Sequence, residues 1–552
     1  MGVEAFKTGS ILALAVAWMP VVFAQGSCAD SRDLRLVNGR IVTMDQRNTI
    51  ASEVTVQNGR IDAVGSPRKQ SACTRTINLR GRTVVPGIVD NHNHIVLLGM
   101  RPGHDIRIET AASIADVQAA LKARAKTVPK GAFITTLGDF NIKQFSEKRL
   151  PTLQELDAAL PEHPYIMNGG GGTAVNSLAK TFFESKGVAV SPAGVIAGGA
   201  PFNTALNALR AAQTWEDKKR GTIDAMNYMT SLGITTSSDM GAFALPGSPD
   251  MLTAAVAESV ESLNPWTMYD AYLALHRESK MTSRLRIFFL SQDTAADVPI
   301  LKQRLNNAFP DFGDDMLKIS GIGEFAAAWN FGGRGGAPPT TPANYETALK
   351  LVAEHGWAFQ QHTLSLNEDQ FTTSTFEKVN AVTPIANLHW VIGHVPRIDR
   401  PTLDRLKAIG AGVAVHGWLY LSGTPQNGGP PFRTIVDSGI HVGAGSDAAA
   451  VSVFDPWLEM YYMVTGKNSA GELINPGQQL TRVEALRLYT AANGWYTHEE
   501  DKLGTIEPGK FGDLVVLSAD YLDPKKVSDE DIKRIRSVLT VVDGKVVYDD
   551  LH

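Results

Sequence analysis

Two histidines separated by one residue, His92 and His94, have a spacing that suits a metal ion. They end the run VVPGIVDNHNH, which reads as a short buried strand opened by Pro86-Gly87. Residues i and i+2 of a strand face the same side, so both imidazoles can bind one ion. The pair alone is weak evidence: 13 histidines in 552 residues give about 0.3 such pairs by chance. Whether the pair indicates a metal site therefore depends on the residues and predicted strands around it.

Eight apolar runs in the central part of the chain are typical of parallel strands that alternate with helices. They predict an α/β fold with a (β/α)8 TIM-like barrel. Several runs end in His, Lys or Asp, and catalytic groups of such barrels lie at the carboxyl ends of the strands. The runs are TVVPGIVDNHNH, GITTSSDMG, RLRIFFL, DMLKIS, WAFQQHT, HWVIGHV, GAGVAVHG and IHVGAGSD.

The segment PGIVDNHNH resembles the first-strand metal motif of the amidohydrolase superfamily. The similarity extends to VNGRIVTMD near the N-terminus, and to LGTIEPGKFGDLVVL and VVDGKVVY near the C-terminus. RLPTLQELDAALPEHPYIM and AVNSLA further resemble the subgroup of N-substituted formamide deformylase-like metal-dependent hydrolases. The resemblance implies a hydrolase that uses a divalent metal ion.

The resemblance also implies further ligands, residue by residue. His362 ends WAFQQH like the fifth-strand histidine of the family, and His394 ends WVIGH like the sixth-strand histidine. Asp447 ends HVGAGSD like the eighth-strand aspartate, and Lys318 in DMLKIS matches the fourth-strand lysine. With the first-strand pair, this set implies one or two divalent ions, and zinc is expected because neutral imidazole suits it.

The expected chemistry gives separate roles to Asp447 and Lys318. A bound metal lowers the pKa of water toward about 7, and Asp447 would take the proton of that water and pass it to the leaving group. Two ions need an anionic bridge, which the resemblance assigns to Lys318 as a carboxylated lysine; a buried or ion-paired lysine is the alternative. The subgroup usually continues with Asp-Gly, but here Ile322 holds the aspartate position and Glu324, close by, is a substitute for some role.

Residues near the predicted strand ends are candidates for the substrate pocket, with packing or loop structure as the alternative for each. They are Trp329, Arg334, Trp418 and Tyr420. Relatives commonly carry a histidine where this chain has Gly171, so its substrate contacts are expected to differ.

The leading interpretation is hydrolysis of an amide or related C–N bond, other than a peptide bond, in a small molecule. The alternatives are an ester, lactone or peptide-like substrate on the same site, or a catalytically silent binding protein. There is no G-x-S-x-G elbow and no phosphate-binding P-loop. A formal charge of −5 argues against nucleic acid as a partner. A homo-oligomer is left open.

The first 24 residues read as a signal peptide, with Lys7, an apolar run from Ile11 to Phe23, and a cut after Ala24. The run is too short to span a bilayer, and a buried N-terminal helix is the alternative. A periplasmic or secreted protein is therefore expected. Cys28 and Cys73 would enter an oxidising compartment, where a disulfide between them is predicted; two free thiols are the alternative.

Short strands at both ends of the chain predict a small β-sandwich assembled from residues 25–85 and 498–552. Asn38-Gly39, Asn58-Gly59 and Asp543-Gly544 are hairpin signals within these segments. Residues 86–497 are assigned to the barrel, with an insertion at about 101–220 over its mouth. No membrane span is expected.

Overall fold

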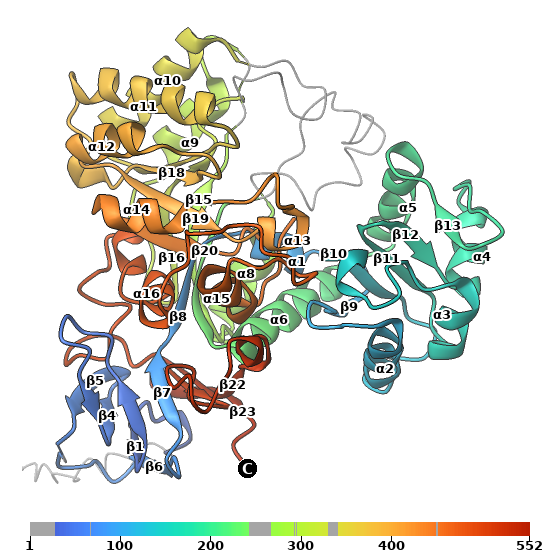
Figure 1. Ribbon diagram of the computed structural model, residues 1–552, viewed down its shortest axis with the longest axis horizontal. Helices are drawn as coiled ribbons and strands as arrows, with labels where there is room; N and C mark the ends of the chain where they lie inside the picture. Colours follow the sequence, from blue (N-terminus) through green and yellow to red (C-terminus); the bar gives the residue numbers. More distant parts are fainter. Residues whose placement is uncertain are drawn as a thin grey trace, which may run out of the picture.

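The computed structural model (Figure 1) describes residues 28–66, 68–241, 267–291, 293, 295–328, 340–448 and 451–552. The expected signal peptide over residues 1–24 lies outside the described residues, as do Trp329 and Arg334. Within the described ranges, no helix is both long enough and apolar enough to cross a membrane.

Eight parallel strands form the central sheet; seven of the predicted runs contain one strand each, and the eighth run, DMLKIS, contains only the first half of its strand. The last strand, β20, lies beside the first, β8, so that the sheet is a nearly closed barrel. Most strands are buried along their whole length, as expected for a parallel sheet covered on both faces. The predicted fold class is confirmed. The strands are β8 (Ile88–Asn93), β14 (Ile234–Asp239), β15 (Arg284–Phe289), β16 (Leu317–Glu324), β17 (Ala358–His362), β18 (Val391–His394), β19 (Gly412–His416) and β20 (Val442–Gly445).

Helices cover the outside of the barrel, and their ends follow ordinary capping chemistry. For example, α10 starts at Pro342 after Thr341, whose side chain accepts a hydrogen bond from the backbone N–H of Asn344. Its buried face, with Tyr345 and Leu349, packs into the main core. The outer helices are α6 (Trp215–Leu232), α8 (Asp270–Arg277), α9 (Pro299–Asn307), α10 (Pro342–Glu354), α11 (Leu366–Asn380), α12 (Arg400–Ala408), α14 (Phe432–Ser438), α15 (Pro456–Thr465) and α16 (Arg482–Leu488).

Two sheets built from both termini lie below the barrel in Figure 1. Strand β7 pairs with β21, so that Val85 lies opposite Val515 although 430 residues separate them. One sheet has the order β5 (Arg60–Val64), β4 (Val54–Gln57), β1 (Leu34–Val37), β6 (Arg75–Asn78). The other has the order β23 (Lys545–Asp549), β22 (Ser537–Val542), β21 (Leu514–Leu517), β7 (Thr83–Pro86), β2 (Arg40–Val42), β3 (Ile50–Ala51). Apolar residues of both sheets share one core.

Two of the three predicted hairpins are confirmed, and one is wrong. Asn58-Gly59 joins β4 to β5, and Asp543-Gly544 joins β22 to β23, with positive φ at both turn residues in each case. At Asn38-Gly39 the chain instead passes from β1 in one sheet to β2 in the other. A Cβ at Gly39 would overlap the side chain of Leu79, so close packing explains this glycine.

A disulfide joins Cys28 to Cys73, with their Cα atoms 5.1 Å apart. The predicted pairing is therefore confirmed, and it ties the start of the described chain to the loop before β6.

The segment between β8 and α6 forms a separate five-stranded sheet, to the right of the barrel in Figure 1. It has two apolar clusters of its own. Strand β10 contacts α13 (Leu419–Ser422), the short helix that follows β19, so this sheet reaches the carboxyl-terminal side of the barrel. Its order is β13 (Val195–Ile196), β12 (Gly172–Val175), β11 (Tyr165–Gly170), β10 (Ile134–Asn141), β9 (His104–Asp105). Its helices are α2 (Ile114–Ala125), α3 (Leu153–Ala159), α4 (Ser177–Ser185) and α5 (Ala200–Arg210).

Candidate metal centre

Six barrel strands deliver titratable side chains to one buried cluster. The carboxyl ends of parallel strands meet at the same rim of a barrel, which is why residues far apart in sequence gather there. All members of the cluster are buried. They are His92 and His94 at the end of β8, Glu324 on β16, His362 on β17, His394 on β18, His416 on β19 and Asp447 just after β20.

Glu324 lies among four of these histidines. Its Oε2 is 2.5 Å from Nδ1 of His362 and 3.3 Å from Nε2 of His394. Nε2 of His92 lies 3.8 Å from the same oxygen, and Nε2 of His94 lies 3.8 Å from Oε1. One carboxylate therefore faces imidazoles from three different strands.

Asp447 approaches three of the same imidazoles. Its Oδ1 is 3.6 Å from Nε2 of His92 and 3.4 Å from Nε2 of His94, and its Oδ2 is 3.5 Å from Nδ1 of His394. The backbone N–H of Asp447 donates to the carbonyl of His92 at 2.8 Å, which fixes the residue beside β8.

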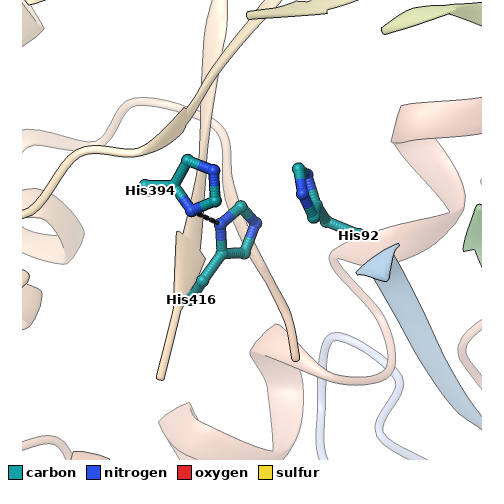
Figure 2. A group of neighbouring side chains, drawn as sticks. All are labelled: His92, His394 and His416. Carbon is teal, nitrogen blue, oxygen red and sulfur yellow. Dashed lines mark hydrogen bonds between the residues drawn. The ribbon is translucent and has the colours of Figure 1, made fainter. Parts of the chain in front are cut away.

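His416 completes a group of three histidines with His92 and His394, which Figure 2 shows together. Nδ1 of His416 is 2.7 Å from Nδ1 of His394, so one ring donates and the other accepts. The ring of His416 also lies 4.1 Å from that of His92, centroid to centroid. The seventh barrel strand thus contributes a histidine that can act as a metal ligand.

Hydrogen bonds behind the cluster orient its side chains. Nδ1 of His94 donates to the carbonyl of Gly241 at 2.6 Å, so Nε2 is the ring nitrogen that can bind a metal ion, in exchange for its proton. Asp90 accepts from the backbone N–H of His92 at 3.1 Å and from the hydroxyl of Ser446 at 2.6 Å. Asp90 thereby ties the ends of β8 and β20 together.

The pKa shifts follow from this crowding of charge. Burial opposes ionisation of Glu324 and Asp447, but the neighbouring histidines outweigh it and hold both carboxyl pKa values well below the usual range. Burial, reinforced by His362, lowers the pKa of His394 to about 4. Burial lowers that of His94 too, yet Asp447 and Glu324 outweigh it and raise the pKa to about 9. The negative charges of the two carboxylates thus stabilise positive charge inside the cluster.

The donor set fits a divalent cation. Among the described residues, the buried Nε2 atoms of His92 and His416 have no hydrogen-bond partner, although an unpaired polar atom is costly in a protein interior. Two ligand atoms about 2.1 Å from a tetrahedral ion lie about 3.4 Å apart, close to the spacings around Glu324 and Asp447. In the described part of the chain, three overlapping groups of three residues have the spacing of metal ligands: His92–His394–His416, His92–His94–Glu324 and Glu324–His362–His394.

Comparison with known proteins identifies the family. The model of the amidohydrolase family matches residues 75–548. The chain belongs to the amidohydrolase family.

This amidohydrolase is 25% identical to the N-substituted formamide deformylase of Arthrobacter pascens, over 94% of this chain and 98% of that protein. It is 24% identical to a putative amidohydrolase of Bacillus subtilis (strain 168), over 93% and 98% of the two chains. An uncharacterized metal-dependent hydrolase from Pyrococcus horikoshii shares the fold, with a TM-score of 0.58 and 17% identity over 89% of this chain and 98% of the other. A mutant atrazine chlorohydrolase from Arthrobacter aurescens, solved with zinc and atraton, has a TM-score of 0.55 and 15% identity over 94% and 95%.

The structure brings five of the six expected ligands of this amidohydrolase together and places Lys318 elsewhere. Lys318 is the second residue of β16, and the strand runs six residues further, to Glu324. Its Nζ donates to the carbonyl of Thr497 at 2.9 Å and is 2.9 Å from a carboxylate oxygen of Asp311. The expectation that Lys318 is a carboxylated metal ligand is therefore corrected. The side chain is ion-paired at the opposite end of the barrel.

Glu324 and His416 complete the cluster, and neither of them was predicted from the sequence to be a ligand. Glu324 lies two residues after Ile322, which replaces the aspartate of the subgroup. This departure from the family pattern could have indicated that Glu324 is a ligand. His416 ends the predicted strand GAGVAVHG as His394 ends WVIGH, so its position at a strand end was a usable signal too.

The two described pocket candidates differ. Trp418 lines a cavity of about 510 Å³. Tyr420 is buried, its ring packs against Tyr461 at 6.4 Å between centroids, and it does not line that cavity. Trp418 is therefore placed to meet a ligand, whereas Tyr420 serves packing.

Proposed function

We propose that this amidohydrolase is an exported enzyme that uses a divalent metal and water to hydrolyse an amide or related C–N bond in a small molecule. The observation that carries the proposal is the position of Glu324 and Asp447, two ionised carboxylates beside imidazoles at the catalytic rim of the barrel. The similarity to an N-substituted formamide deformylase over nearly the full length of both chains supports the choice of a C–N bond.

One or two ions, with zinc preferred, would be held by the carboxylates and histidines of the cluster. The ligands proposed are His92, His94, Glu324, His362, His394 and Asp447, with His416 as a further candidate. A divalent ion bound there lowers the pKa of water to about 7 and stabilises negative charge on a carbonyl oxygen.

Asp447 is proposed as the general base and proton shuttle. Its pKa lies well below the usual range because His394, His92 and His94 outweigh its burial, so it is ionised at neutral pH. The carboxylate accepts a proton from the attacking water and passes it to the leaving nitrogen. Water attacks directly, and no covalent enzyme intermediate forms.

Export is supported by two features of the N-terminal region. Residues 1–24 have the charge, apolar run and cleavage residues of a signal peptide. The Cys28–Cys73 disulfide is of the kind that persists in oxidising compartments such as the periplasm or the extracellular space.

An activity screen of the metal-loaded protein tests the proposal. The panel contains N-formyl and N-acetyl amines, N-acyl amino acids, dipeptides, esters and lactones, each assayed again after chelation. We expect chelator-sensitive hydrolysis of at least one non-peptide amide, with one ¹⁸O atom from labelled water in the acid product of a single turnover. Turnover of esters or lactones alone would favour the alternative substrate class. No turnover by a fully metallated protein would favour a binding function.

A further inference from the structure

A cavity of about 510 Å³ lies between the barrel mouth and the five-stranded sheet. Its barrel-side wall comes from residues that closely follow members of the metal cluster in the chain. Leu97 follows His94 by three residues, and Trp418 follows His416 by two. Its other wall comes from β10, β11 and α5, and includes Phe140. The volume is in the range of small-molecule sites, about 300–1,000 Å³.

Arg210, the last residue of α5, lines this cavity with an unusual lack of partners. In the described part of the chain, its guanidinium has neither a carboxylate within 4.0 Å nor a hydrogen bond. Burial lowers its pKa to about 10, which leaves it charged at neutral pH. The side chain is half-buried, and a charge that has lost much of its contact with water normally needs a partner, because its desolvation is costly.

The other arginine of the cavity wall is paired. Arg101 donates to Asp105 at 3.1 Å, and Asp105 also lies 3.7 Å from Arg107. The carboxylate of Asp105 is thus already shared between two guanidinium groups. Among the described residues that line the cavity, Arg210 is therefore the cation that a ligand can contact.

We propose that the cavity binds the part of the substrate remote from the scissile bond, and that Arg210 pairs with a carboxylate there. This inference rests on the proposed function, since it places the reacting amide at the adjacent metal cluster. The side chains of Leu97, Phe140 and Trp418 provide an apolar and aromatic surface for the body of the substrate. A guanidinium binds carboxylate in a planar, bidentate geometry, which favours a carboxylate over a neutral polar group. The substrate class is an N-acylated compound with an apolar body and an anionic end.

A matched pair of substrates tests the role of Arg210. 4-(2-Formamidoethyl)benzoate and N-formylphenethylamine differ only in the ring carboxylate, which lies at the end remote from the formamide. In Arg210→Gln, we expect kcat/KM for 4-(2-formamidoethyl)benzoate to fall about 10- to 100-fold, as for a lost hydrogen bond to a charged group. The value for N-formylphenethylamine should stay within about twofold, and Arg210→Lys should restore part of the loss. Metal content and thermal melting confirm that each variant is intact.

The control is Arg149→Gln, which removes a positive charge from the same segment, where Arg149 pairs with Glu155. It should affect both substrates equally. Binding of 3-phenylpropanoate and 3-phenylpropanamide to the metal-loaded protein gives a second readout if neither formamide is turned over, and Arg210→Gln should weaken only the former. Absence of all amide hydrolysis would count against the proposed function. An equal effect of Arg210→Gln on both members of each pair, or no effect on either, would overturn the carboxylate site.

Discussion

Glu324 and His362, which end the neighbouring strands β16 and β17, lie 2.5 Å apart between Oε2 and Nδ1. The position that a carboxylated lysine was expected to fill is thus occupied by a genetically encoded carboxylate. Its negative charge does not depend on CO₂. Metal binding should therefore be the same in bicarbonate-free and bicarbonate-containing buffer.

Replacing Glu324 should weaken metal binding, whereas replacing Lys318 should not. In Glu324→Gln, we expect at least a tenfold to hundredfold loss of affinity, about the loss seen for residues that merely support a ligand. Lys318→Met should lose stability, because Asp311 and Glu499 lose a cation, yet keep its metal. Elemental analysis after dialysis against a weak chelator measures both. A folded Lys318→Met protein without metal would contradict the assignment.

The protein purified without chelator should contain one or two divalent ions per chain, mainly zinc. A ligand that binds only the folded state stabilises it, so chelation should lower Tm and zinc should restore it. Elemental analysis and thermal melting are the measurements. Fewer than about 0.3 ion per chain, with no activity gained on adding metal, would count against the site.

The Cys28–Cys73 disulfide should stabilise the terminal sheets by about 2–4 kcal/mol, as expected for a closed loop of this size. Cys73→Ser and reduced wild-type protein should therefore unfold at lower denaturant concentration than oxidised wild type. In exported material, mass spectrometry should find no free thiol and a chain that starts at Gln25. A mature chain that still carries residues 1–24 would contradict export by a cleaved signal peptide.

The fold was predictable because its signals are local. Runs such as RLRIFFL and WAFQQHT have enough β-branched and aromatic residues to mark buried strands, and each ends near a polar residue. The sequence predicted that strands from the two termini share one β-sandwich, because neither set has enough strands to be stable alone. It did not predict which residues pair, such as Val85 with Val515. The hairpin predicted at Asn38-Gly39 was wrong because this dipeptide occurs both in hairpins and in turns that lead from one sheet to another.

The position of Glu324 in the site was harder to predict, because the second half of its strand contains two glycines. The strand was predicted to end with the run DMLKIS, at Ser320, because Gly321 and Gly323 are poor strand formers. The strand in fact continues to Glu324, about 20 Å beyond Lys318 at about 3.3 Å per residue. A Cβ at Gly321 would overlap the ring of Phe288, so packing requires glycine there.

A buried ion pair, at the end of the barrel opposite the metal cluster, should make the free energy of unfolding of the protein sensitive to acid. Arg286 donates to Glu499 at 2.6 and 3.0 Å, and both side chains are almost fully buried. Burial raises the pKa of Glu499, but Arg286 outweighs it and the net pKa is lowered. A carboxyl with a depressed folded pKa contributes stability above its unfolded value of about 4.3, and this is lost as pH falls below it.

The variant Glu499→Gln should therefore lose about 3–5 kcal/mol near neutral pH, because Arg286 is left buried without its partner. The difference from wild type should narrow as pH falls below about 4.3. Denaturant unfolding at several pH values measures this difference. The control is Glu507→Gln, because the side chain of Glu507, which pairs with Lys510, is exposed to solvent. A difference that does not change with pH would contradict the role of this carboxylate.

Asp447→Asn should separate catalysis from metal binding. Asparagine keeps the shape of the side chain and a carbonyl oxygen toward His92 and His94, but it cannot accept a proton. A general base contributes a factor of about 10²–10⁴, so kcat should fall by at least that range. At least one ion should remain in place, because Glu324 and the five histidines of the cluster are unchanged. The measurements are single-turnover kinetics and elemental analysis on the same sample, with wild type as the reference. Near-normal turnover by a metallated Asp447→Asn protein, or trapping of an acyl-enzyme, would overturn the assignment of Asp447 as the base.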